Sequence, residues 1–250
     1  MAEKGKGRRV ILADEWRGLV LLLMVFYHGC YDLVALFGVP LSWFYTGLGH
    51  TLQQFICISF ILISGLCCRF SRSNLKRGAV AFGLAMALTL GTLIATPQVA
   101  IWFGVLHLLG VSMMLYPLLR PALDRLPRDV GLALFLLLFL CCKQVPSGWV
   151  GLGPWRAALP AALYQTPWLA WLGFPGPGFS SGDYFPLIPW LLLFLAGSFL
   201  GRRAQAGDLP GFCYRSHLPW LAAVGRASIW IYMLHQPVLY GALWLYFRVL

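Results

Sequence analysis

The sequence predicts an all-α, polytopic transmembrane helix bundle of about seven spans, with its N-terminus in the cytoplasm. Of the 250 residues, 60% are hydrophobic and only 11% are charged, whereas soluble domains carry about 25% charged residues. The apolar residues gather in runs of about 20, the length that crosses roughly 30 Å of hydrocarbon. The basic residues are concentrated in alternate connections. We therefore expect residues 1–250 to form a single transmembrane domain.

The apolar runs give the bounds of the expected spans. They are 17–37, 50–68, 78–96, 99–119, 127–145, 186–202 and 226–247. A basic segment precedes the first run, as in a signal peptide. However, that run is about 20 residues long, and a cleaved apolar region has only about 7 to 15. We expect the first span to be retained.

The distribution of basic residues supports this topology. Seven spans place 16 of the 19 Lys and Arg residues on the cytoplasmic side, among them Lys4, Lys6 and Arg8. The three on the outer side are Lys143, Arg156 and Arg248. Because this asymmetry follows the positive-inside rule, the net charge of +11 reflects topology, and we expect no nucleic-acid partner. The seven cysteines lack the spacing of zinc ligands, so we expect neither a disulfide framework nor a metal.

Three histidines, His28, His107 and His235, lie inside predicted spans. Because an ionisable group is costly at bilayer depth, each is a candidate functional residue. Asp32 follows His28 at i+4, where its carboxylate is expected to hold one imidazole nitrogen and leave the other as a base. A polar pair that satisfies itself at a helix interface is the alternative. His107 lies between two glycines and has a packing role as its alternative.

The last expected span carries a polar stripe formed by Ser228, Tyr232 and His235. Pro237 is expected to bend this helix beside His235 and Gln236, which would make room for a cavity. On the outer side, Asp183 and the following Tyr184 precede the sixth span. Asp183 is expected to cap that helix or to meet a polar substrate at a pocket mouth.

Basic residues gather at the cytoplasmic ends of the spans. Such residues anchor topology and neutralise phosphates. They are Arg17, Arg69, Arg72, Lys76, Arg77 and Arg226, with Ser64 and Ser228 close by.

Five blocks of sequence resemble a known family. They are Arg17-Gly18 with LLLMVFYHGCYD, then FILISG, FGVLHLLG, DYFPLIPW and GRASIWIYMLHQP. They resemble the DUF1624 family, which belongs with the heparan-alpha-glucosaminide N-acetyltransferase catalytic domains among transmembrane acyltransferases. The resemblance covers about residues 14 to 247.

The resemblance implies transfer of an acyl group from cytosolic acetyl-coenzyme A, or another acyl-coenzyme A, to an amino or hydroxyl group of an extracytoplasmic sugar or glycan. It implies an integral membrane enzyme, in the inner (plasma) membrane if bacterial. The expected catalytic residues are His28, Asp32, His107, Tyr232 and His235. The expected donor-binding residues are Arg17, Ser64, Arg69, Arg72, Lys76, Arg77, Arg226 and Ser228. The expected acceptor-binding residues are Asp183, Tyr184 and Gln236.

Other functions and a second partner remain open at this stage. Intramembrane His and Asp also suit a transporter or proton relay, and histidines on facing helices suit a haem-binding electron carrier. Gly197 and Gly201 form a GxxxG spacing that fits either a homodimer seam or packing within the bundle.

Overall fold

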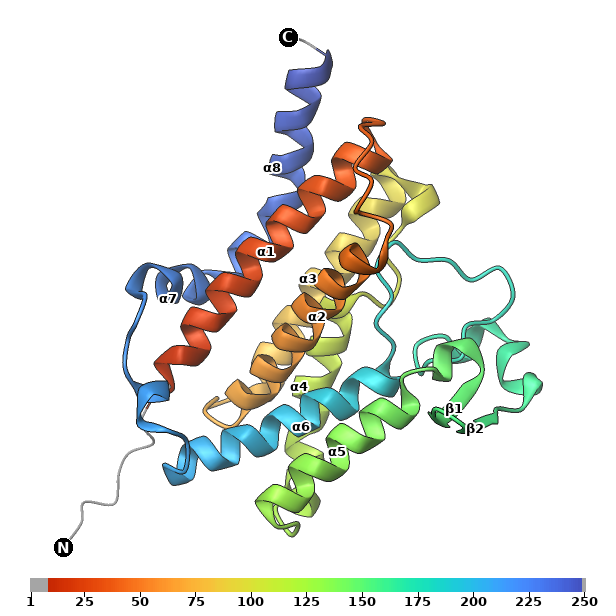
Figure 1. Cartoon of the computed structure of the whole chain (residues 1–250). Coiled ribbons are helices and arrows are strands. Elements are labelled where there is room, and N and C mark those ends of the chain that lie inside the picture. The colour runs from red at the N-terminus through yellow and green to blue at the C-terminus, as the bar shows by residue number, and fades with distance from the viewer. Residues whose placement is uncertain (1–8, 249–250) are drawn as a thin grey trace, which may run out of the picture. The chain divides into compact units, whose positions relative to one another are not determined.

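A computed structural model describes residues 9–248 of the chain (Figure 1), so Lys4, Lys6 and Arg8 lie outside the described residues. These residues confirm the predicted all-α class. The α-helices in this part of the chain are α1 Ile11–Ala35, α2 Gly47–Cys68, α3 Asn74–Ala95, α4 Val105–Leu123, α5 Arg128–Cys142, α6 Leu187–Ala206, α7 Pro219–Arg226 and α8 Ser228–Arg248. A hairpin joins β1 Trp149–Leu152 to β2 Trp155–Ala158. The 3-10 helices are η1 Pro97–Val99, η2 Val145–Ser147, η3 Ala161–Tyr164, η4 Pro167–Leu169 and η5 Gly211–Tyr214.

Within the described residues, six segments are long and apolar enough to cross a membrane, and the chain is an integral membrane protein. They are α1 to α4, α6, and a segment from Arg128 to Ser147 that contains α5. The seventh predicted span does form a helix, the 21-residue α8. It is not one of the six. Its centre carries His235, Gln236 and Pro237, which lower its hydropathy. That α8 crosses the membrane stays a prediction.

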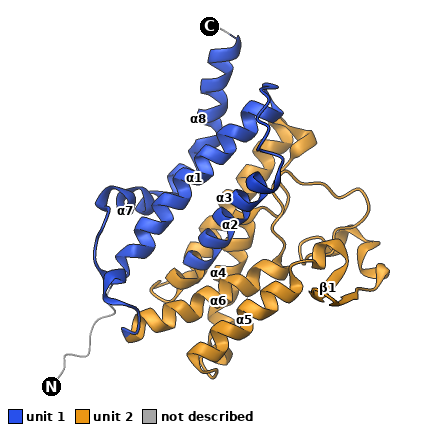
Figure 2. Ribbon diagram, viewed as in Figure 1, with its two compact units in different colours: residues 1–63, 207–250 blue, residues 64–206 orange. Residues whose placement is uncertain are grey.

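The chain divides into two compact units (Figure 2). Unit 1 comprises residues 1–63 and 207–250, and unit 2 comprises residues 64–206. The division falls within α2, so each unit holds part of that helix. The expected single domain is neither supported nor contradicted by this division.

In unit 1, α1 and α7 cross with their backbones in close contact. A Cβ on Gly18 would lie 2.1 Å from the Leu221 carbonyl oxygen, and one on Gly225 would lie 2.0 Å from the Asp14 carbonyl oxygen. Only glycine permits this approach. The side chain of Glu15, which is 4% exposed, fixes the crossing. Its Oε1 accepts hydrogen bonds from Ser216 Oγ and from the backbone N–H groups of residues 217 and 218, at 2.8 to 2.9 Å.

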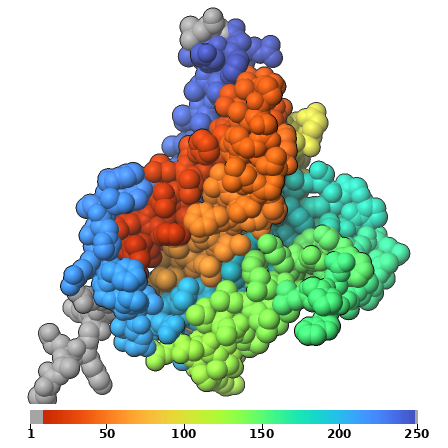
Figure 3. Space-filling view, viewed as in Figure 1, coloured from red at the N-terminus to blue at the C-terminus, as the bar shows by residue number. Residues whose placement is uncertain are grey.

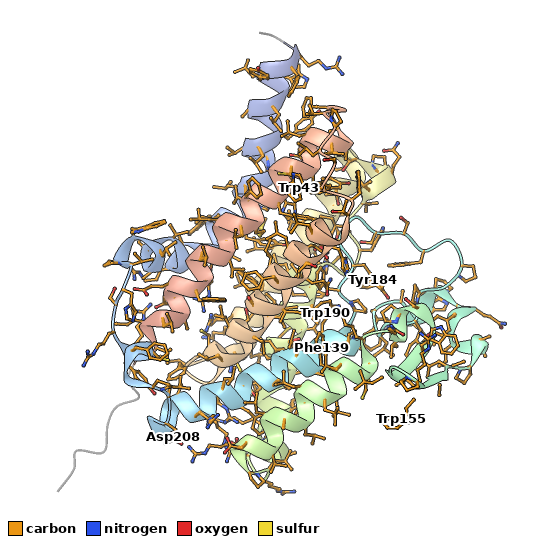
Figure 4. The ribbon with its side chains drawn as sticks, viewed as in Figure 1. Trp43, Phe139, Trp155, Tyr184, Trp190 and Asp208 are labelled. Atoms are coloured by element: carbon orange, nitrogen blue, oxygen red, sulfur yellow. The ribbon has the colours of Figure 1, made fainter. Side chains whose placement is uncertain are left out.

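In unit 2, small residues and aromatic rings join the helices. A Cβ on Gly78 would lie 2.6 Å from the Gly110 carbonyl oxygen, so α3 and α4 pack closely. The rings of Phe139 and Trp190, 5.4 Å apart, pack α5 against α6 (Figure 4).

The GxxxG glycines of α6 face the end of α2 in the same chain. A Cβ on Gly65 would lie 3.1 Å from the Gly197 Cα, and one on Gly201 would lie 2.5 Å from the Leu66 carbonyl oxygen. These contacts favour packing within the bundle. A homodimer is therefore not supported.

The start of α4 corrects two expectations. A helix was predicted from residue 99, but η1 and an irregular segment precede α4, which begins at Val105. The reason is that Asp183 accepts a hydrogen bond from the Val105 backbone N–H through its Oδ2 at 2.9 Å. Asp183 thus accepts a hydrogen bond from an N–H group that has no partner within α4 itself. The prediction was that Asp183 caps α6, and it caps α4 instead. As a result His107 lies in the first turn of α4, and not about two turns into a helix that begins at residue 99.

Two elements were missed by the sequence analysis. Helix α7 has only eight residues, too few for a spanning pattern. The hairpin turns at Gly153, whose φ is +53°, and Trp155 at the start of β2 points away from it with 89% of its surface exposed (Figure 4). Short strands between Gly and Pro residues give little periodicity.

Replacing Gly225 with Ala is expected to destabilise the protein, by about 1 to 3 kcal/mol or more, because the new Cβ forces α7 away from α1. Thermal unfolding in detergent measures this effect. Gly241→Ala in α8 is the matched control, since nothing lies within 4 Å of its Cβ position. That control should be neutral or slightly stabilising. Equal midpoints for both variants would contradict the close crossing.

The Asp183 cap gives a second prediction. Loss of contact with water raises the pKa of Asp183 to about 6, although the hydrogen bond from Val105 opposes the shift. The folded state then holds this proton more tightly than the unfolded state, so stability is lost as pH rises from about 4 to about 6. Asp183→Asn keeps an acceptor for Val105 and should lack this loss. Asp183→Ala should also lack this loss, and should be less stable than Asp183→Asn by about 1 kcal/mol at all pH values, because the cap is gone. Thermal midpoints of the three proteins between pH 4 and pH 8 test this, and parallel curves for wild type and Asp183→Asn would contradict it.

Candidate functional site

Two of the three candidate histidines meet in unit 1. His28 of α1 and His235 of α8 have ring centroids 4.8 Å apart and planes inclined at 75°. Both side chains are partly buried. Two axial imidazoles would lie on opposite sides of a haem, and ring centroids 4.8 Å apart leave too little space for an iron and both of its nitrogen–iron bonds between the rings. The pair therefore does not fit a haem sandwiched between these imidazoles.

The hydrogen bonds of the two rings define their chemistry. His28 Nδ1 lies 2.9 Å from the Met24 carbonyl oxygen, and His235 Nδ1 lies 2.7 Å from the Tyr232 carbonyl oxygen. A carbonyl oxygen only accepts hydrogen bonds, so each Nδ1 carries the hydrogen. In the neutral ring, each Nε2 then holds an unshared electron pair. His235 Nε2 is buried and finds no partner among the described residues.

Asp32 was expected to pair with His28, but in the structure it pairs with Gln236. The Asp32 side chain is fully buried, and its Oδ1 accepts a hydrogen bond of 2.6 Å from Gln236 Nε2. Helical side chains lean toward the N-terminus, so the His28 ring reaches the carbonyl of the preceding turn while Asp32 turns to α8. The interaction that fixes the His28 tautomer thus comes from the backbone.

Further polar atoms lie on the same two helices. Asp32 Oδ2 and Gln236 Oε1 are buried and, within residues 9–248, have no hydrogen-bond partner. Both are acceptors. The Tyr232 ring lies 5.8 Å from the His235 ring, and Ser228 is the first residue of α8. A group placed among these atoms would meet acceptors and one phenol.

His107 belongs to unit 2 and is held in a separate network. Its Nδ1 accepts a hydrogen bond from the Gly104 backbone N–H at 3.2 Å, and its Nε2 lies 3.3 Å from Thr89 Oγ1. Thr89 Oγ1 donates to the Ile101 carbonyl at 2.7 Å, so His107 Nε2 carries the hydrogen and donates to Thr89. Both nitrogens are thereby engaged. This fits the packing alternative for His107.

Arg69 was predicted to bind a cofactor, but the structure buries and pairs it. Its side chain is 2% exposed, and its NH2 nitrogen lies 2.5 Å from Asp124 Oδ1. Its Nε donates to the Ser198 carbonyl at 3.3 Å. The hydrogen bond from Arg69 holds the pKa of Asp124 below its ordinary value. This guanidinium therefore joins three segments of unit 2 and does not present a free face to a phosphate.

The other predicted donor-binding residues of unit 2 lie near the start of α3. Arg72, Lys76 and Arg77 are exposed, and Ser64 is partly buried. Ser73 caps α3 by accepting a hydrogen bond from the Lys76 backbone N–H at 3.3 Å. This arrangement leaves the three charges at the surface of unit 2.

Unit 1 carries a pocket where α7 crosses α1; its accessible lining is mostly apolar, and we call it the basic pocket because two arginines are among its lining residues. Its volume is about 300 Å³, and its lining includes Arg9, Asp14, Ser216 and Arg226. Asp14 pairs with Arg9 at 2.7 Å and with Arg17 at 3.3 Å. Arg226 was predicted as a donor-binding residue, whereas Arg9 and Ser216 were missed because the sequence does not show that α7 folds back to α1.

A second pocket lies in the long connection of unit 2. Its volume is about 340 Å³, and its lining includes Phe179, Ser180, Ser181 and Tyr184. Tyr184, predicted to bind the acceptor, donates its hydroxyl to the Ala170 carbonyl at 2.6 Å. Its ring packs against Phe179, with centroids 4.9 Å apart. Tyr184 thus forms a wall of this pocket.

Comparison with known proteins places the chain in a family. The family model described as heparan-alpha-glucosaminide N-acetyltransferase, catalytic, matches residues 9–237. This range includes the two histidines of unit 1, the Asp32–Gln236 pair and the basic pocket. No curated protein and no solved structure matches the chain. Because the match covers most of the sequence, the chain belongs to the family of heparan-alpha-glucosaminide N-acetyltransferase catalytic domains.

Proposed function

We propose that this protein moves an acyl group, such as acetyl, from cytosolic acyl-coenzyme A to an amino or hydroxyl group of an extracytoplasmic sugar or glycan. The observation that carries the proposal is the pair of imidazoles, His28 and His235, whose Nδ1 atoms are tied to backbone carbonyls. Their Nε2 atoms are available as bases. Such nitrogen atoms can remove a proton from an attacking nucleophile.

In the proposed reaction, the acceptor nitrogen or oxygen attacks the thioester carbonyl of acyl-coenzyme A while His28 Nε2 takes its proton. The tetrahedral intermediate collapses by breaking the carbon–sulfur bond. The departing thiolate receives the proton from the His28 imidazolium. The products are an acylated acceptor and free coenzyme A, and His28 returns to its neutral state.

Residues near His28 are candidates to stabilise the oxyanion, to accept a proton and to bind the acceptor. Tyr232 is the candidate donor to the developing oxyanion, since neutral His235 presents an unshared pair at Nε2 and cannot donate there. His235 is a second proton acceptor. Asp32 Oδ2 and Gln236 Oε1, both acceptors, suit the N–H or O–H groups of the incoming acceptor. His107, with both nitrogens engaged, is assigned to holding the start of α4.

The basic pocket at the α1–α7 crossing is the proposed site for the phosphates of the donor. Guanidinium groups pair well with phosphate oxygens, and Arg226 lines this pocket. At about 1.5 Å per residue, His28 lies about 21 Å from Asp14 along α1. The extended pantetheine arm of coenzyme A, together with the diphosphate that it carries and the length of an arginine side chain, approaches such a distance. The positive-inside prediction places this pocket on the cytoplasmic side and the Tyr184 pocket on the outer side, where it is a candidate contact for a glycan.

His28→Ala should lower the rate of acyl transfer by about 10²- to 10⁴-fold, because the base is lost. The assay follows free thiol when purified protein is mixed with acetyl-coenzyme A and glucosamine. His50→Ala, which removes an exposed histidine of α2, is the matched control and should retain activity. Equal thiol release by His28→Ala and wild type would remove His28 from the mechanism. Trapping of labelled acetyl on His28 without acceptor would replace direct attack by an acyl-histidine route.

Arg226→Gln should raise the KM for acyl-coenzyme A by about tenfold, since one charge-assisted contact to phosphate is lost. The value of kcat should change little, because the pocket is remote from the reacting carbonyl. Arg125→Gln removes an exposed arginine between α4 and α5 and serves as the control. A KM unchanged by Arg226→Gln would place the donor elsewhere.

A further inference from the structure

Helix α7 lies across α1 within unit 1, not alongside it (Figure 1). The glycine contacts occur at Asp14 and Gly18, within the first two turns or so of α1. At about 1.5 Å per residue, this is within about 10 Å of the N-terminal end of that helix. A short helix across the end of a spanning helix has the position of an element at the membrane–water interface.

The two faces of α7 differ in chemistry. Leu221, Ala222 and Gly225 are buried against its own unit. The outward side of the helix carries Trp220, which is 56% exposed, with the smaller Pro219 and Ala223, and Leu218 just before the helix is 47% exposed. Figure 3 shows the α7 region at the surface of its unit.

The segment that leads into α7 continues this outward face. Phe212 of η5 is 55% exposed, and Arg215 is exposed beside it. Arg226 is exposed at the end of α7. Residues 209–227 include no Asp or Glu. The outward face of residues 211–226 therefore combines aromatic and aliphatic side chains with positive charge.

We propose that this outward face, the α7 surface, binds anionic phospholipid at the cytoplasmic leaflet. Aromatic rings with a polar edge prefer the headgroup level, which suits Trp220. Apolar side chains such as Phe212 and Leu218 enter the boundary between headgroups and acyl chains. Arg215 then lies at the level of the lipid phosphates, where its guanidinium pairs with them.

The fixed position of α7 makes the surface suited to a specific lipid site. Glu15 accepts three hydrogen bonds from residues 216–218, so the entry to α7 is ordered before any lipid binds. A rigid surface loses less conformational entropy on binding than a flexible one. The proposal goes beyond the acyltransferase function and does not depend on it.

The test uses the full chain in nanodiscs of phosphatidylcholine alone or with phosphatidylglycerol. The thermal midpoint of the wild type should rise with the anionic lipid. Arg215→Gln should lose about half of this rise or more, because one basic residue near the surface strengthens anionic lipid binding about fivefold. Arg125→Gln removes an exposed arginine outside the α7 surface and should keep the rise. Equal rises for both variants, or no rise in the wild type, would overturn the proposal.

A second measurement keeps the test informative if Arg215→Gln fails to fold. Phosphatidylcholine brominated near the headgroup quenches tryptophan at that depth. Trp220→Phe, which preserves an aromatic ring, should remove part of the fluorescence that is quenched in the wild type. An identical quenched fraction in both proteins would show that Trp220 does not face lipid and would overturn the proposal.

Discussion

A polar group buried away from water must find its hydrogen-bond partner within the protein, and this constraint shapes the site of unit 1. Two imidazoles satisfy it through backbone carbonyls, those of Met24 and Tyr232. Both carbonyls belong to the preceding turn of the same helix. The cost of burying each ring is therefore reduced locally, and the geometry does not depend on a distant partner.

Local satisfaction has a chemical consequence. Because each Nδ1 is committed to a carbonyl, the tautomer is set and the unshared pair lies on Nε2. Asp32 is consequently not needed to orient His28. It pairs with Gln236 and leaves one buried oxygen for another group. The unit thus presents an excess of acceptors, which suits an acceptor substrate that brings its own N–H or O–H groups.

Much of the fold was predictable from the sequence, because apolar runs and basic loops report directly on span length and orientation. The helix from residue 78 and that from residue 186 were placed within a few residues or so, and the family was recognised from the blocks around His28 and His235. The start of α4 was placed too early, since its cap comes from Asp183, distant in sequence. The pairing of Asp32 with Gln236 was missed for the same reason. Periodicity describes one helix at a time, whereas these contacts join residues more than 70 positions apart.

The sequence likewise does not distinguish basic residues that are buried in ion pairs from basic residues that line a pocket, whereas the structure does. Arg69 and Arg226 both read as basic residues at the end of a span. One is buried against Asp124 and the other lines an open pocket.

The chemistry proposed for the site of unit 1 requires that His28 and His235 are neutral rings with hydrogen on Nδ1. Nitrogen-15 NMR of histidine-labelled protein in nanodiscs, assigned by loss of signals in His28→Ala and His235→Ala, tests it most directly. We predict a protonated Nδ1 and an unprotonated Nε2 in both rings at neutral pH, and hydrogen on Nε2 of His28 would contradict this assignment.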